Sequence, residues 1–216
     1  MIPWHTGPLT EIAVLGAHCD DIPIGLGATL LTLTAALPGV RVRALVLTGA
    51  GTAREDEERA ALAAFCGGTR PDLTVRALPD GRTPAHWGEV KDAVREFRAG
   101  SAPDLVFAPH TADPHQDHRL LAELVTTEFR DHPVLRYEIP KWDTESWHPT
   151  VYVPFGEDLA ARKAALLREH YPSQAGRDWF DDRTFLGLAR VRGVQCRAPY
   201  AEAFTSDKLV LQFGSR

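Results

Sequence analysis

The sequence predicts an α/β fold built on a mostly parallel sheet. Short apolar runs, which are typical of buried strands, alternate along the chain with amphipathic segments of about ten or more residues, which are typical of helices. Two of the apolar runs lead into a polar loop and then a helical segment, as in β-α-β units. With 216 residues, 44% hydrophobic and 25% charged, the chain suits one globular domain, and we expect a single domain over residues 1–216.

The elements follow from local patterns. The first strand is the apolar run at 12–15, which ends at Gly16, where the backbone can turn without a Cβ. A break at Pro38-Gly39 separates the next helix from the second strand. In order, we expect a strand at 12–15, a helix at 25–37, a strand at 40–47, a helix at 54–65, a strand at 74–78, a helix at 86–99, a strand at 104–108, a helix from about 118, strands at 134–139 and 151–155, and a helix at 158–170. Beyond residue 180 we expect a helical piece and an edge strand near the end.

The composition indicates which partners and which cellular compartment to expect. The formal charge of -5, with no basic block, argues against a nucleic-acid partner. The three cysteines, Cys19, Cys66 and Cys196, form no C-x-x-C pair and are odd in number, which is typical of reduced thiols in the cytosol. The first residues lack a signal-peptide pattern, and no stretch approaches the length of a membrane span. We therefore expect a cytoplasmic protein with no membrane span, and leave open a homo-oligomer.

The first polar loop follows the first strand, within the stretch AHCDD at 17–21. An imidazole (His18) and carboxylates (Asp20, Asp21) suit a divalent metal such as zinc, and the second carboxylate could take a proton from water at that metal. The carboxyl ends of parallel strands are where α/β proteins bind ligands. The alternative is that Asp20 or Asp21 caps the following helix and that His18 is only a loop residue.

The second polar loop follows the strand at 104–108 and repeats the arrangement of the first. It reads PHTADPHQDHRLL and carries His115, Asp117 and His118. Two such loops at one edge of a parallel sheet can face each other and bring ligands that are distant in sequence together. A non-haem iron oxygenase is an alternative, because His18-x-Asp20 and a distant histidine could form its triad. Those enzymes are expected on all-β barrels, and the alternation of strands and helices argues against them.

The two motifs, AHCDD at 17–21 and HQDH at 115–118, resemble those of the PIG-L/LmbE-like zinc-dependent N-deacetylases. The usual forms in that family are A-H-P-D-D and H-P-D-H, so Cys19 and Gln116 each replace a proline. Every position expected to carry chemistry is retained. The agreement extends to an Arg54 and Glu57 pair, Leu78-Pro79-Asp80-Gly81, a helix from Lys163 to His170 followed by Ser173-Gln174, and Tyr200-Ala201-Glu202-Ala203-Phe204.

The resemblance implies a Rossmann-like three-layer sandwich and a metal site with room for water. The implied ligands are His18, Asp21 and His118, holding Zn²⁺, with Fe²⁺ or another divalent metal as the alternative. Three protein ligands and an open position are also what catalytic zinc needs on chemical grounds. Asp20 is then expected to be the general base that takes a proton from the attacking water.

The same resemblance gives roles to the rest of the second motif. His115, protonated and oriented by Asp117, is expected to stabilise the oxyanion and to deliver a proton to the departing amine. The alternative for Asp117 is the N-cap of the helix that begins nearby.

Substrate contacts are expected from an arginine and two tryptophans. Arg54 could bind a hydroxyl or phosphate oxygen of the substrate, or could form an ordinary helix-surface ion pair with Glu57 or Glu58. Trp142 and Trp147 could form an aromatic wall against a sugar ring, or could close over the core.

The function implied is hydrolysis of the N-acetyl group of an N-acetylglucosamine-type sugar, in a sugar nucleotide, a glycoside or a natural-product intermediate. The alternatives are an amidase of a non-acetyl sugar conjugate and a non-catalytic sugar-binding module. Asp20 argues against the module, because mere binding does not need a base.

Overall fold

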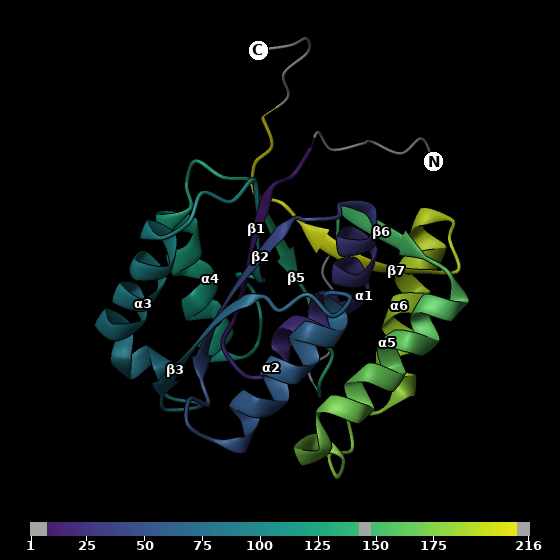
Figure 1. The fold of residues 1–216 in the computed structure, drawn as a ribbon, viewed down its shortest axis with the longest axis horizontal. Coiled ribbons are helices and arrows are strands. Elements are labelled where there is room, and N and C mark those ends of the chain that lie inside the picture. The colour runs from purple at the N-terminus through teal and green to yellow at the C-terminus, as the bar shows by residue number, and fades with distance from the viewer. Residues whose placement is uncertain (1–7, 143–147, 211–216) are drawn as a thin grey trace.

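The computed structural model describes residues 8–142 and 148–210 and contains a seven-stranded sheet with helices on both faces (Figure 1). The strands are β1 (Glu11–Gly16), β2 (Arg41–Thr48), β3 (Asp72–Leu78), β4 (Leu105–Pro109), β5 (Val134–Tyr137), β6 (Val151–Phe155) and β7 (Tyr200–Thr205). The α-helices are α1 (Asp21–Ala36), α2 (Ala53–Phe65), α3 (Trp87–Ala99), α4 (Gln116–Glu128), α5 (Glu157–His170) and α6 (Asp182–Cys196), with 3₁₀ turns η1 (Thr83–His86) and η2 (Pro172–Gln174).

The strand order is β3-β2-β1-β4-β5-β7-β6. The first five strands of that order are parallel, and β7 pairs antiparallel with both β5 and β6. Ile12 of β1 lies opposite Val42 on one side and Leu105 on the other. The predicted α/β class with a mostly parallel sheet is therefore confirmed.

Alternate side chains of β1 point to opposite faces of the sheet, and each face is covered by its own helices. Ile12 and Val14 belong to a cluster with residues of α1, α2 and α5. Ala13 and Leu15 belong to a second cluster with residues of α3 and α4. Figure 1 shows α3 and α4 on one side of the sheet and α1, α2 and α5 on the other, which gives the three layers of the expected sandwich.

Most predicted elements are present, with differences at their ends. The first helix begins at Asp21 rather than residue 25, and the fourth at Gln116 rather than near His118. The helical piece beyond residue 180 is α6, but the strand after it is not at an edge. β7 lies between β5 and β6, because β6 takes the edge position and β7 pairs on both sides. Over residues 8–142 and 148–210, no helix has the length and apolar character needed to cross a membrane.

Candidate metal centre

The site lies at the carboxyl ends of two neighbouring strands, β1 and β4. β1 leads into the loop at 17–20 and β4 into the loop at 110–115, and a helix follows each loop. The two strands pair in parallel, with Val14 opposite Phe107, so both loops leave the sheet at the same edge. The sheet order makes this the switch point, since the chain adds β2 and β3 on one side of β1 and β4 on the other. Ligands of α/β proteins bind in such crevices.

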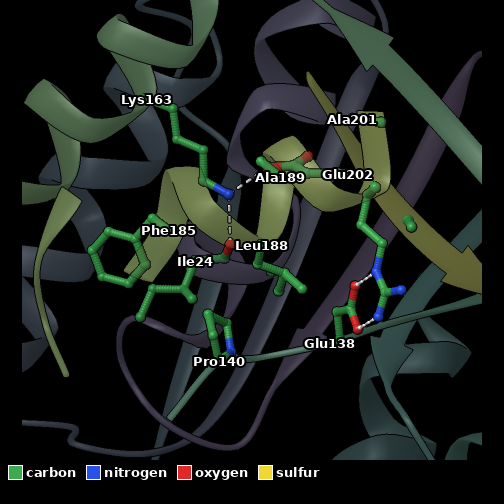
Figure 2. Close-up of a pocket in the computed structure, with 12 residues that line it drawn as sticks. Ile24, Glu138, Pro140, Lys163, Phe185, Leu188, Ala189, Ala201 and Glu202 are labelled. Carbon is green, nitrogen blue, oxygen red and sulfur yellow. Dashed lines mark hydrogen bonds and ion pairs between the residues drawn. The ribbon is translucent and has the colours of Figure 1, made fainter. Parts of the chain in front are cut away.

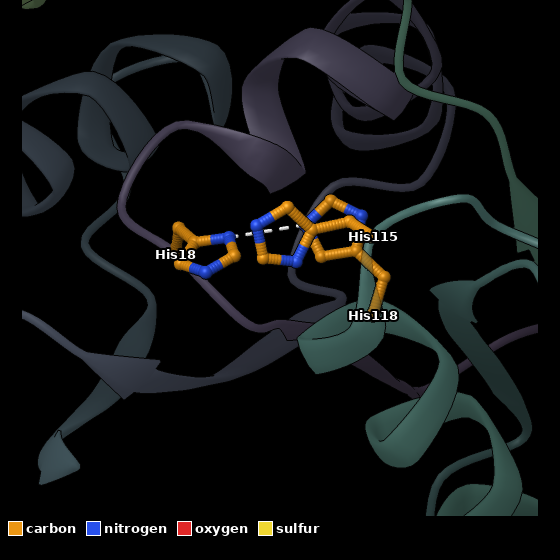
Figure 3. Close-up of side chains that lie close together, drawn as sticks. All are labelled: His18, His115 and His118. Carbon is orange, nitrogen blue, oxygen red and sulfur yellow. Dashed lines mark hydrogen bonds between the residues drawn. The ribbon is translucent and has the colours of Figure 1, made fainter. Parts of the chain in front are cut away.

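Three side chains converge at this edge. His18 Nδ1 lies 3.0 Å from His118 Nε2 and 3.5 Å from Asp21 Oδ2, and His118 Nε2 lies 3.2 Å from the same Asp21 oxygen. Tetrahedral bonds of about 2.0–2.1 Å to zinc would place ligand atoms about 3.3–3.4 Å apart. All three residues are buried. Figure 3 shows the contact between the ring nitrogens of His18 and His118, with His115 beside them. The structure thus brings the three predicted ligands to distances from one another that one metal ion could bridge.

Each of the two converging imidazoles has a carboxylate at its other ring nitrogen. His18 Nε2 lies 3.1 Å from Asp117 Oδ2, and His118 Nδ1 lies 3.0 Å from Asp113 Oδ2. Carboxylates in this position orient metal-ligating histidines and raise their basicity. Asp117 is therefore next to His18, whereas the sequence assigned it to His115.

Asp117 is held by backbone groups of a separate loop. Its carboxylate accepts from the N–H of Gly81 at 2.7 Å and from that of Thr83 at 3.1 Å. Burial acts against ionisation, but these bonds and the one from His18 lower the pKa of Asp117 to about 2. The helix-cap alternative for Asp117 is wrong, because His115 occupies the N-cap of α4 and its ring accepts from the Asp117 N–H.

The donor set fits a divalent cation. Asp21 Oδ2 accepts from the N–H groups of Ala17 and His18, both at 2.9 Å, while Asp20 Oδ1 and Asp21 Oδ1 are buried with no hydrogen-bond partner among the described residues. A buried carboxylate oxygen without a partner is costly. Burial lowers the pKa of His118, but the charge of Asp21 and the contact with Asp113 outweigh it and raise that pKa to about 9. The site therefore attracts positive charge, which a metal ion would supply.

Asp20 stands beside these atoms in a strained backbone conformation. Its φ of 133° lies in a region that non-glycine residues rarely adopt, and such strain clusters at functional sites. Burial and the charge of Asp21 raise the pKa of Asp20 to about 6. The capping alternative is wrong for both carboxylates: Asp20 holds the N-cap of α1 without a side-chain bond, and Asp21 binds N–H groups that precede the helix.

Arg54 contacts Asp20 directly. Its Nη2 donates to Asp20 Oδ2 at 2.8 Å, and its Nη1 donates to Glu57 Oε2 at 3.1 Å and to Ser173 Oγ at 2.7 Å. It also contacts the backbone oxygen of Cys19. The ion pair with Glu57 that the sequence left open is present, but Arg54 also holds one oxygen of Asp20, which neither prediction for this residue included.

His115 differs from its predicted state. Its ring Nδ1 accepts from the backbone N–H of Asp117 at 3.2 Å, and its ring centroid lies 4.6 Å from that of His18 and 4.7 Å from that of His118. Burial, together with the positive charges of His118 and His18, lowers the pKa of His115 to about 4. The expectation of a protonated ring oriented by the Asp117 carboxylate is thus not met. A neutral ring whose Nδ1 accepts carries its proton on Nε2.

Of the two predicted aromatic contacts, Trp142 is on the surface and Trp147 lies outside the described residues. The Trp142 side chain is 65% exposed, and its Nε1 donates to Asp178 Oδ1 at 3.1 Å. Its ring meets Trp179 edge to face at a centroid distance of 6.1 Å. Trp142 therefore does not close over the core.

A family comparison covers both motifs. The model of the PIG-L family, described as GlcNAc-PI de-N-acetylase, matches residues 13–129. The chain belongs to the PIG-L family. It is also similar to the uncharacterised deacetylase YaiS of Escherichia coli K12, with 30% identity over 172 residues that span 74% of this chain and 89% of YaiS.

Solved structures share the fold of this PIG-L chain. The N,N'-diacetylchitobiose deacetylase of Pyrococcus horikoshii matches with a TM-score of 0.70 and 21% identity, over 92% of this chain and 84% of that one. The 4-carboxy-2-hydroxymuconate hydratase GalB of Pseudomonas putida matches with a TM-score of 0.68 and 17% identity, over 96% and 100%. Because one fold serves a deacetylase and a hydratase, likeness at this level shows the fold and leaves the reaction to the site.

Two carboxylates of this PIG-L site are not predicted by the sequence patterns. Asp113 backs His118, and the exposed Asp80 places Oδ1 at 3.1 Å from His18 Nε2. Asp113 stood in the second polar loop, but its spacing to His118 matches no ligand pattern. Asp80 stood in a Pro-Asp-Gly turn, where Asp is expected for local reasons. Long-range packing brings Asp80 to His18, and the fold of the loop between β4 and α4 brings Asp113 to His118.

Proposed function

We propose that this PIG-L protein is a metal-dependent hydrolase that removes the N-acetyl group from an N-acetylglucosamine-type sugar. One observation carries the proposal. Three atoms converge on one point: Nδ1 of His18, Nε2 of His118 and Oδ2 of Asp21. The neighbouring carboxylate in the chain, Asp20, is not part of this group and has an oxygen, Oδ1, without a hydrogen-bond partner among the described residues. We propose zinc as the ion, with Fe²⁺ as the alternative. A bound zinc ion would act as a Lewis acid that polarises a carbonyl and would lower the pKa of water to about 7.

Asp20 is proposed as the general base. Arg54 holds Oδ2, which leaves the unpartnered Oδ1 to accept a proton from water. A pKa of about 6 leaves the carboxylate ionised at neutral pH and close enough to that pH to exchange a proton efficiently. We assign Arg54 to this contact rather than to the substrate, because both of its terminal nitrogens already bind protein groups.

His115 is proposed to stabilise the oxyanion as a neutral donor. Its Nδ1 is taken by the Asp117 N–H, so the Nε2–H is the group that can donate to the developing negative charge on the acetyl oxygen. A neutral His115 has no extra proton to give to the departing amine. The proton that Asp20 has taken from water is available for that step, so one carboxylate serves as base and then as acid.

The substrate class rests on the relatives and on Trp142. The Pyrococcus horikoshii relative is named for a diacetylated sugar, and exposed tryptophan rings provide flat apolar surface for such rings. We propose a small-molecule N-acetylated sugar as substrate, with Trp142 against the part beyond the acetylated ring. The cytoplasm stays the proposed compartment, supported by three free cysteines.

The test is release of acetate from a panel of N-acetylated sugars by the zinc-loaded protein, before and after chelation and after zinc is restored. Acetate should appear, stop on chelation and return with zinc, and it should also form under nitrogen, which an oxygenase would not allow. Asp20→Asn should keep its zinc and lose about 10²–10⁴-fold in kcat. The proposal fails if no sugar yields acetate, if chelation has no effect, or if Asp20→Asn retains full activity. Release of a different carboxylic acid would indicate an amidase of a non-acetyl conjugate. Loss of the substrate without release of any carboxylic acid would indicate a hydratase.

A further inference from the structure

Helix α1 is broken one turn after the metal-binding loop. Leu26 has φ -143° and ψ 22°, which is not helical, so a short first segment from Asp21 is separated from the rest of the helix. In an unbroken helix the Ala28 N–H would donate to the Ile24 carbonyl. Sharp breaks occur at proline, at glycine, or where a side chain inserts into the backbone ladder, and Gly25 and Gly27 flank Leu26 on both sides.

Two buried charged side chains from distant elements occupy that break. Lys163 of α5 donates from Nζ to the Ile24 carbonyl at 2.7 Å, and Glu202 of β7 accepts from the Ala28 N–H at 2.9 Å and from the Thr29 N–H at 2.6 Å. Lys163 and Glu202 also pair with each other at 2.6 Å (Figure 2). We call this pair the α1 clip. It replaces the missing helical bond on both sides, since one member binds the carbonyl and the other the N–H.

The clip is isolated from water. Lys163 is 3% exposed and Glu202 5%. Taking two charges out of water is expensive, and a buried pair is often no more stable than well-packed apolar residues. The contacts here are directed at backbone groups that no apolar side chain could satisfy, so the charges serve to hold a specific backbone geometry.

That geometry connects directly to the site. The Ile24 N–H donates to the Asp20 carbonyl at 3.0 Å, while the Ile24 carbonyl accepts from Lys163. One residue therefore links the clip to the strained backbone of Asp20, and the first segment of α1 carries Asp21. On this evidence we propose that Lys163 and Glu202 are positioning residues, which fix the first turn of α1 and so set Asp20 and Asp21 relative to His118. The inference rests on the proposed metal centre.

The test measures Co²⁺ affinity by competition with a chromophoric chelator, together with the visible spectrum of the bound Co²⁺, in Lys163→Met and Glu202→Gln. A purely electrostatic effect has opposite signs in the two variants, because one loses a positive and the other a negative charge. Positioning predicts the same sign in both: at least tenfold weaker binding and an altered spectrum. Opposite signs, or no change in either variant, would overturn the proposal.

Two further variants separate positioning from stability. Arg192 and Glu138 line one pocket together with Lys163 and Glu202 (Figure 2). Among the described residues, the hydrogen bonds of the Arg192 side chain go to Glu138 and Gln195 and not to α1. Arg192→Met should therefore lower Tm while changing Co²⁺ affinity less than threefold. The double variant Lys163→Met/Glu202→Gln leaves no unpaired buried charge, so it should fold even if the single variants do not.

The double variant should still bind Co²⁺ at least tenfold more weakly than the wild type. The Ile24 carbonyl loses its Lys163 donor, and a glutamine has one acceptor oxygen for the two N–H groups of Ala28 and Thr29. Wild-type affinity in the double variant, or an equal loss in Arg192→Met, would refute the clip while leaving the metal centre intact. Failure of the wild type to bind Co²⁺ would instead refute the metal centre and this inference with it.

Discussion

Replacing Asp113 by Asn tests the carboxylate behind His118. Asp113 Oδ2 lies 3.0 Å from His118 Nδ1, and its Oδ1 accepts from the His115 N–H at 2.8 Å. An asparagine has one acceptor oxygen where the carboxylate has two, so one of these contacts is lost. Loss of such a partner typically costs 10–100-fold in metal affinity, about 1.4–2.8 kcal/mol. We expect zinc affinity to fall by that factor in chelator competition.

The pH dependence of this loss adds a second check. Asp113 helps to raise the pKa of His118 to about 9, so in the wild type a proton competes with the metal below that pH. Asn removes part of this competition, which offsets some of the lost affinity at pH 7. The deficit of the variant should therefore grow as the pH rises toward 9. Asp92→Asn, an exposed residue of α3 with the same charge change, is the control. The reasoning would be refuted if Asp113→Asn bound zinc within twofold of the wild type at both pH 7 and pH 9, or if Asp92→Asn lost as much zinc affinity as Asp113→Asn.

Three further outcomes are expected. Gly25→Ala should lower the free energy of unfolding by about 1–3 kcal/mol in urea titrations, because its Cβ would lie 2.3 Å from the buried Tyr137 ring, whereas Gly187→Ala, in open space on α6, should not destabilise. Burial raises the pKa of Glu58 from 4.5 to about 8, so between these pH values the metal-free fold holds a proton that the unfolded chain releases. From pH 4.5 to pH 8 the free energy of unfolding of the wild type should therefore fall by about 2–4 kcal/mol more than that of Glu58→Gln. An equal pH dependence of the free energy of unfolding in both proteins would contradict this expectation. Trp142→Ala should raise KM for N-acetylated disaccharides about threefold to tenfold, the equivalent of about 0.5–1.5 kcal/mol, with kcat unchanged, and an unaltered KM would remove Trp142 from the substrate site.

The predictions that succeeded rest on local patterns. The apolar run at 12–15 and the one at 104–108 are buried strands because their residues pack on both faces of a parallel sheet. Loops that follow neighbouring parallel strands must meet at one edge, so His18 and His118 could be expected to converge although 100 residues separate them. The predictions that failed concern partners. The edge position given to β7, the protonated state of His115 and its pairing with the Asp117 carboxylate all depend on which distant group lies alongside.

By itself, the sequence determined the alternation of strands and helices, the two His/Asp loops and the metal chemistry that they predict, because periodicity and side-chain type are properties of neighbouring residues. Only the tertiary structure decided that Asp117 faces His18, that Asp113 backs His118, and that Lys163 and Glu202 enter the break in α1. These contacts join groups that lie far apart in the chain or on different sides of one loop. No local pattern encodes which ring nitrogen meets which carboxylate, since that depends on how the packed layers orient each side chain.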